Sequence, residues 1–311
     1  IILSGLLMVF YDVGYNFLAK YGLFKNLVFI KIMQNSSIVI FQLLYGFSLN
    51  DNNEIPFNNG LIAGFIFGQV FSLLLLMFIL IKYSLSKIKS KLQFNLMNYV
   101  QIIFNHKKFI YYSMPAEFIN SLSYYLVIYF ITINFGVFYA GLYGLSQRVI
   151  MGPLNLISLS LLDIFKNYAS EELIQSNSIN KSYKLMLKIL FILSIFCFIV
   201  ILILKDYFGL IFGLIFGEEW KDVGKIVLIL TPFYLTKFIS NPLSYTFFLV
   251  KKQEIDLFWQ AGLLLIVYFV FFASDNFYNA LTIFSVMVST YYLFNLFLSY
   301  KLSVKWIFLI Q

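Results

Sequence analysis

The sequence predicts an all-α, polytopic helical membrane protein of about nine transmembrane helices, and three observations support this fold class. Of the 311 residues, 61% are hydrophobic and only 12% are charged, with a mean hydropathy of +0.86. A water-soluble fold carries about a quarter charged residues and could not cover its surface with so few. The apolar residues form blocks of roughly twenty, enough to cross a hydrocarbon core of about 30 Å. The basic residues lie on alternate loops between these blocks.

The apolar blocks give the expected helices in chain order. The first two are the weakest, because Asp12 interrupts one and Lys31 lies near the start of the other. In the third block, Gly60, Gly64 and Gly68 form a small-xxx-small face that favours close helix contact. The expected spans are residues 1–19, 27–48, 60–81, 109–134, 137–161, 185–204, 223–249, 257–273 and 278–300.

Two segments between the spans are predicted to interact with the membrane without crossing it. Residues 82–108 form the longest basic connection and carry a weak amphipathic pattern. We expect a linker that lies partly in the membrane interface, with an ordinary cytoplasmic loop as an equal alternative. Residues 207–217 are apolar but too short to span, which predicts a helix lying on the outer face. The expected domains are residues 1–100, a partial first lobe with the linker, and residues 101–311, a second lobe.

The basic residues orient these spans. Of the 22 basic residues, 17 lie on one alternating set of loops and three, Lys205, Lys221 and Lys225, on the other. Short cytoplasmic loops retain Lys and Arg, so the first set is predicted to be cytoplasmic, together with the C-terminus. The net charge of +8 therefore reflects topology and gives no reason to expect nucleic acid as a partner.

Several functional classes are excluded by composition. The chain has one Cys and one His, Cys197 and His106, too few for a disulfide scaffold, a zinc site of the usual ligand type, a haem or an iron–sulfur cluster. We therefore expect no metal, no cofactor and no catalytic residues. The chain also begins with Ile inside an apolar run, so we expect it to be part of a longer protein.

Two stretches resemble one family of transporters. Residues 136–172 read GVFYAGLYGLSQRVIMGPLNLISLSLLDIFKNYASEE, with a short FG loop, a Gly-x-Tyr opening, a central Arg, a Pro-Leu step and an acidic exit. Residues 216–253 read FGEEWKDVGKIVLILTPFYLTKFISNPLSYTFFLVKKQ, with an FG-x-x-W turn, a central Pro and a later Asn-Pro-Leu. The pattern is similar to that of bacterial polysaccharide or O-antigen flippases, the oligosaccharide-translocase branch of the multidrug/oligosaccharidyl-lipid/polysaccharide exporter superfamily. The resemblance implies two lobes around a central cavity, with helices four to twelve present here and the first three missing.

Charged residues at membrane depth are the strongest candidates for a site. A charge there costs at least ~2.5–3.5 kcal/mol on insertion scales, so each needs a partner or a water-filled cavity. Arg148 and Lys237 lie near the middle of their spans and are expected to face a cavity that binds substrate. Glu117 follows Pro115, and an ion pair with Arg148 is as well supported as contact with substrate. Asp12 and Glu117 are the candidates for ion coupling.

Polar neutral residues complete the predicted site. Hydroxyl and amide groups can bind sugars, although each can instead satisfy internal backbone groups. Asn120, Tyr124 and Asn241 are the expected substrate contacts, and the further candidates are Ser123, Asn155, Ser240 and Tyr245.

The resemblance implies a flippase that moves an undecaprenyl-pyrophosphate-linked oligosaccharide, of the O-antigen or capsule type, across the bacterial inner membrane by alternating access. Arg can grip the pyrophosphate in two places. The expected partners are this lipid-linked oligosaccharide, membrane lipids, and polysaccharide polymerase and chain-length proteins.

Two alternatives stay open. A drug/cation antiporter of the same superfamily would be expected to place acids at the centre, whereas the two deepest charges here are basic. A polysaccharide-modifying membrane enzyme would need a large outer loop with Arg or His, or a His within the membrane. The longest outer segment, residues 205–222, contains neither residue.

Overall fold

The chain is a multi-pass, all-α membrane protein. The computed structural model describes residues 2–20, 24–48, 60–87, 104 and 107–305, which form helices and contain no strand. Seven helices in this part of the chain are long and apolar enough to cross a membrane. The two weakest predicted spans lie in helices whose shorter apolar stretches are Gly5–Tyr15 and Phe29–Leu44. The fold class predicted from composition and block length is therefore confirmed.

The helices form two compact units, residues 1–96 and 97–311. Unit 1 contains α1 (Ile2–Lys20), α2 (Phe24–Ser48) and α3 (Gly60–Lys87), and all three pack against one another. Much of the predicted linker, including His106, lies outside the described residues.

Glycines bring α2 and α3 unusually close. A Cβ atom at Gly64 would lie 2.5 Å from the backbone nitrogen of Gln42, and one at Gly68 would lie 2.6 Å from the Cα of Ile38. This confirms the close contact that the small-xxx-small pattern predicts. Polar bonds reinforce it, since the Ser37 hydroxyl donates to the carbonyl of Gly68 at 3.2 Å.

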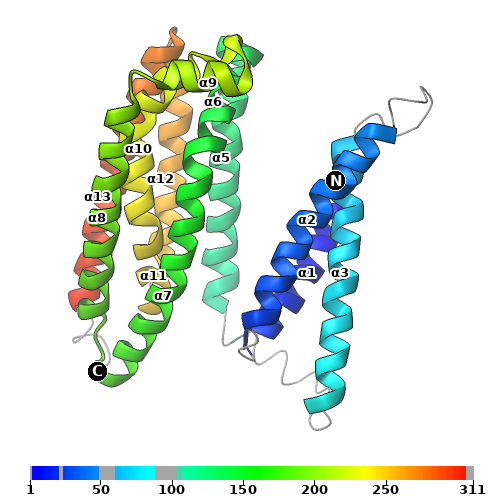
Figure 1. The fold of residues 1–311 in the computed structure, drawn as a ribbon. Helices are drawn as coiled ribbons and strands as arrows, with labels where there is room; N and C mark the ends of the chain where they lie inside the picture. The colour runs from blue at the N-terminus through cyan, green and yellow to red at the C-terminus, as the bar shows by residue number, and fades with distance from the viewer. Residues whose placement is uncertain (1, 21–23, 49–59, 88–103, 105–106, 306–311) are drawn as a thin grey trace. The chain divides into compact units, whose positions relative to one another are not determined.

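Unit 2 carries the larger bundle (Figure 1). Its π-helical turns η1 and η2 precede prolines 115 and 153, and glycines with positive φ, Gly136 (+99°) and Gly217 (+107°), allow the sharp turns before α6 and η3. In order, the elements are η1 (Phe109–Ser113), α5 (Met114–Phe135), α6 (Val137–Ser146), η2 (Gln147–Met151), α7 (Gly152–Ser176), α8 (Asn180–Leu204), α9 (Phe208–Phe216), η3 (Glu218–Trp220), α10 (Val223–Leu243), α11 (Thr246–Leu249), α12 (Gln253–Phe272) and α13 (Phe277–Lys305).

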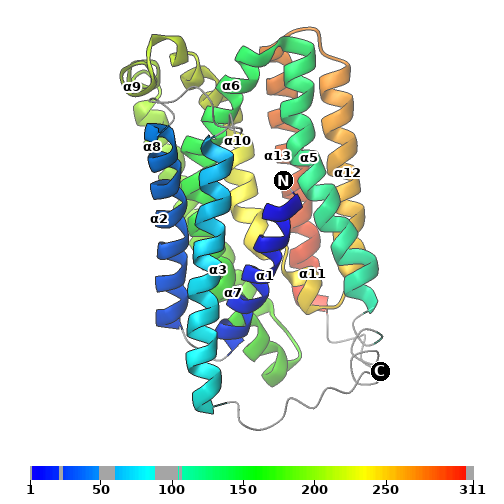
Figure 2. The same ribbon diagram turned by 90° about the vertical axis from the view of Figure 1, so that its right-hand side faces the viewer.

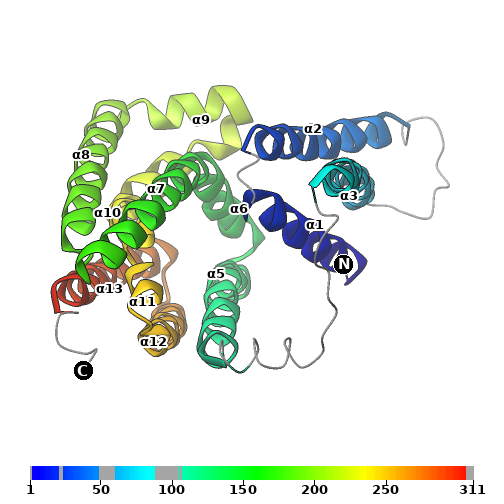
Figure 3. The ribbon, with the colours of Figure 1, turned by 90° about the horizontal axis from the view of Figure 1, so that it is seen from below.

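Helix α10 lies at the centre of unit 2. It packs against α6, α7, α8 and α13, which surround it in the end-on view of Figure 3. On another side of the unit, α5 packs against α12, and the two run side by side in Figure 2. The ring of Trp259 on α12 stacks on that of Tyr291 on α13 at 3.6 Å between centroids. These contacts fix where the side chains of α5, α10, α12 and α13 meet.

Several helices extend beyond the predicted spans, and the largest extension is that of α7. The segment predicted to span at 137–161 continues as α6, η2 and α7 as far as Ser176, because hydropathy marks where the apolar block ends and not where the helix ends. The polar C-terminal part of α7 is held against α8 by Glu172. Its carboxylate accepts hydrogen bonds from the backbone N–H groups of Lys181 and Ser182 at the start of α8. The apolar segment 207–217 forms the short helix α9, which crosses the end of the bundle in Figure 1.

Candidate functional site

Three adjoining cavities lie in unit 2, and residues of α5 and of the continuous run of α6, η2 and α7 line each of them. The amide pocket, of about 280 Å³, is lined chiefly by Asn120, Asn155, Asn241, Gln260 and Asn295. The cation pocket, of about 410 Å³, is lined by Gln147, Arg148 and Lys237 with Asn120, Ser121 and Asn155. The aromatic pocket, of about 760 Å³, is lined by Tyr124, Tyr125, Phe216 and Trp220 with Gly141 and Gly144.

Shared side chains join these cavities into one groove, which we call the unit 2 groove. Asn120, Asn155 and Lys237 line both the amide pocket and the cation pocket. Tyr124, Tyr125 and Arg148 line both the cation pocket and the aromatic pocket. A ligand with chemically different parts could therefore occupy more than one pocket at once.

Lys237 occupies the junction of the amide and cation pockets. It is half-buried on α10, five residues after Pro232, and its ammonium group lies 5.4 Å from the centre of the Phe233 ring. No carboxylate among the described residues lies within ion-pair distance of this ammonium group. Lys237, which its depth in the span predicts to face a cavity, lines both the amide pocket and the cation pocket.

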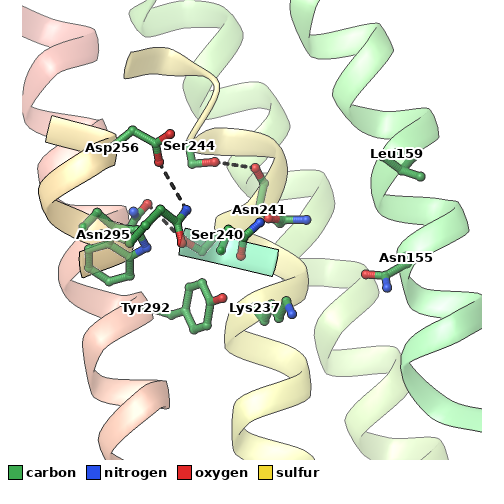
Figure 4. Close-up of a pocket in the computed structure, with 12 residues that line it drawn as sticks. Asn155, Leu159, Lys237, Ser240, Asn241, Ser244, Asp256, Tyr292 and Asn295 are labelled. Atoms are coloured by element: carbon green, nitrogen blue, oxygen red, sulfur yellow. Dashed lines mark hydrogen bonds between the residues drawn. The ribbon is translucent and has the colours of Figure 1, made fainter. Parts of the chain in front are cut away.

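The amide pocket gathers polar side chains from five helices (Figure 4). Within it, the Ser240 hydroxyl donates to the side-chain oxygen of Asn295 at 3.0 Å. The Ser244 hydroxyl donates to the carbonyl of Asn241 at 2.7 Å. The side chains of Asn120, Asn155 and Asn241 make no hydrogen bond to other described residues, so their donors and acceptors are available to a ligand.

Arg148 projects into the groove from the π-helical turn η2. Its side chain is exposed and lines the cation and aromatic pockets. The ion pair with Glu117 that the sequence left open is not formed among the described side chains. Glu117 is exposed in the first turn of α5 and lines none of the three pockets.

The other predicted residues divide between the groove and elsewhere. Ser123 lines a small cavity of about 30 Å³ beside Lys237, and Ser240 lines the amide pocket. Tyr245 instead stacks on Phe248, and the ammonium group of Lys166 lies over its ring. Asp12 belongs to unit 1, where its side chain is exposed on α1.

Sequence reasoning missed Asp256, the one carboxylate lining the described pockets. Asp256 is 6% exposed in the first turn of α12, and Gln260 donates to its carboxylate at 3.3 Å. Its place in the polar segment KKQEID made it resemble a loop residue, and the spacing of four to Gln260 was the available signal. Asn295 and Gln147 were also missed, because no pattern in the sequence shows which amides of a span face the cavity.

Among the described residues, no group of three or more His, Cys, Asp or Glu side chains is arranged to hold a metal ion. The groove instead offers two cations, one carboxylate, many amides and several aromatic rings. Comparison with family models, with curated proteins and with solved structures finds no match to this chain.

Proposed function

We propose that this multi-pass membrane protein is a flippase for a lipid-linked oligosaccharide. It moves an undecaprenyl-pyrophosphate-linked repeat unit across the bacterial inner membrane by alternating access. The observation that supports this function best is that Arg148 and Lys237 line the same pocket and that neither has a carboxylate partner among the described residues. A cation at membrane depth needs a counter-charge or water, and a pyrophosphate group supplies the counter-charge.

The neighbouring amide pocket suits the sugars of such a substrate. Sugar hydroxyls donate and accept hydrogen bonds, and an Asn or Gln amide offers both functions in one planar group. Five amide side chains line this pocket. The arrangement places groups for a polar, uncharged moiety directly beside groups for an anion, as a sugar attached to pyrophosphate requires.

A second candidate function, the drug/cation antiporter, is favoured by Asp256. A buried carboxylate in the amide pocket could attract a cationic substrate. Lys237 lines the same pocket and opposes that attraction, which is why we place the flippase first.

Replacing Lys237 separates the two functions. In vesicles that contain the protein, Lys237→Ala should slow translocation of an undecaprenyl-pyrophosphate-linked oligosaccharide by roughly 10- to 100-fold, because a hydrogen bond to a charged group contributes about 1.5–3 kcal/mol. The rate is measured as the fraction of labelled lipid-linked sugar that becomes accessible to a sugar-cleaving enzyme on the far side.

Lys225→Ala is the matched control. Lys225 lies on the same helix but is exposed and paired with Asp222 at 2.9 Å, so its loss should leave the rate unchanged.

If wild-type vesicles translocate a cationic dye and not the lipid-linked sugar, and Asp256→Asn abolishes that dye transport, the antiporter is the correct function.

The proposed topology has its own test. In a Cys197→Ala background, Asn52→Cys and Asn276→Cys should react with an impermeant thiol reagent added outside the cell, whereas Lys87→Cys and Lys251→Cys should be protected. The physical reason is the retention of basic loops in the cytoplasm, which also places the C-terminus there. Labelling in the opposite sense would reverse the topology. With this orientation, the partners we propose are polysaccharide polymerase and chain-length proteins that receive the flipped product.

A further inference from the structure

Gln147 is buried in the wall of the cation pocket, and the N–H donors of its side-chain amide are unused. It is 5% exposed, and its amide nitrogen is enclosed and has no hydrogen-bond partner. An unsatisfied buried polar group of this kind destabilises the fold. Buried amides of this kind are otherwise nearly always paired, so this donor needs an explanation.

The surroundings indicate what the missing partner is. Gln147 shares the cation pocket with Arg148 and Lys237, and both cations lack a carboxylate partner among the described residues. All three residues line the same cavity of about 410 Å³. The buried acid of the groove, Asp256, lines the amide pocket and accepts a hydrogen bond from Gln260. The cavity thus lacks an acceptor that carries negative charge.

The local backbone explains how adjacent residues serve one cavity. Gln147 begins the π-helical turn η2, in which the N–H of Gly152 donates to the carbonyl of Gln147. A π turn inserts an extra residue and rotates the side chains relative to an α-helix, and such turns occur frequently at functional sites. In this turn, the Gln147 side chain is buried while the Arg148 side chain stays exposed, and both line the cation pocket.

We propose that Gln147 is a ligand of a phosphate-type anion in the cation pocket. Its amide N–H group donates to an oxygen of the anion, which Arg148 and Lys237 bind through charge. The inference rests on the proposed function for the nature of the anion, the pyrophosphate of the substrate. Gln147 adds what the cations lack, a neutral donor held in a fixed position by burial.

The test uses the full chain in detergent and inorganic pyrophosphate as the probe. Gln147→Met keeps the length and volume of the side chain but removes the donor. We expect the dissociation constant of pyrophosphate, measured by titration calorimetry, to rise about tenfold or more, while the melting temperature without ligand stays equal or rises because the unsatisfied amide is gone. Gln147→Glu, which places a carboxylate beside Arg148, should weaken binding further.

Ser285→Ala is the matched control. Ser285 on α13 is another buried group without a partner, but it lines none of the described pockets. Its replacement should leave the dissociation constant unchanged. If Gln147→Met does not accumulate, Gln147→Asn withdraws the same amide by one methylene and should weaken binding in the same direction.

The outcomes separate this inference from the proposed function. Pyrophosphate binding that Gln147→Met, or Gln147→Asn in its place, leaves within twofold of wild type overturns the inference, as does a wild-type protein that does not bind pyrophosphate. If pyrophosphate binds and Gln147 is required, yet no lipid-linked oligosaccharide is translocated, the anion site stands and the flippase function fails.

Discussion

Arg148→Ala is expected to abolish translocation of the lipid-linked oligosaccharide, by 100-fold or more, while the protein accumulates close to its normal level. Arg148 is the only arginine of the chain and the only cation that lines both the cation and the aromatic pockets. Its side chain is exposed in the groove and unpaired with Glu117, so its removal leaves no buried charge behind. Export of surface polysaccharide and membrane abundance, measured together, check this expectation.

Two further variants sharpen the result. Arg148→Lys should restore export only in part, because an ammonium group cannot form the bidentate contact of a guanidinium group. Adding Glu117→Ala to Arg148→Ala should restore nothing, since the two side chains are not paired. If Arg148→Ala exports normally at normal abundance, Arg148 does not bind the anion. Low abundance that Glu117→Ala restores would establish an ion pair instead.

Gly68→Leu is expected to disrupt unit 1. A Cβ atom at this position would lie 2.6 Å from the Cα of Ile38, so any side chain must force α3 away from α2. Overpacking of a core typically costs about 1–3 kcal/mol, and here the obstruction is backbone that cannot rotate away. The change would also lengthen the hydrogen bond from Ser37 to the Gly68 carbonyl. The detergent-solubilised variant should melt several degrees lower and expose unit 1 to protease.

Gly5→Leu provides the comparison for this change. It makes the same substitution in the same unit, but a Cβ atom at Gly5 meets no other atom within 4 Å. This variant should therefore resemble the wild type in melting temperature and protease resistance. If Gly68→Leu also resembles the wild type, the close contact between α2 and α3 does not stabilise unit 1.

The helices could be predicted because a helix that crosses the bilayer must be long enough to match its thickness. Blocks of about twenty apolar residues mark helices without any knowledge of their neighbours. The same reasoning could not place the end of α7, because the segment after residue 161 is polar and yet helical as far as Ser176. The carboxylate of Glu172 that joins this end to α8 is a contact between two helices, which hydropathy does not describe.

Charged residues within the spans gave the clearest prediction of the site. Arg148 and Lys237 are conspicuous because a charge in a span needs a compensating environment, and both line the unit 2 groove. Whether Glu117 faces Arg148 depends on the rotation of α5 about its axis, and this rotation cannot be predicted from the hydropathy of the sequence. Gln147 and Asn295 were missed because the face that an amide presents depends on how its helix packs, as it does for the predicted Asn120, Asn155 and Asn241.

The central position of α10 has a consequence for how the protein is made. Within the candidate span Glu218–Leu249, which contains α10, 67% of an 18-residue apolar stretch is buried, whereas the share is 17% within Asn180–Leu204, which contains α8 and is more hydrophobic. Lipid is thus a good solvent for α8 and a poor one for α10, which carries Lys237 and two prolines. Helix α10 packs against α13, which is synthesised after it. During synthesis, the polar groups of α10 are therefore exposed to lipid until later helices such as α13 insert and pack against it.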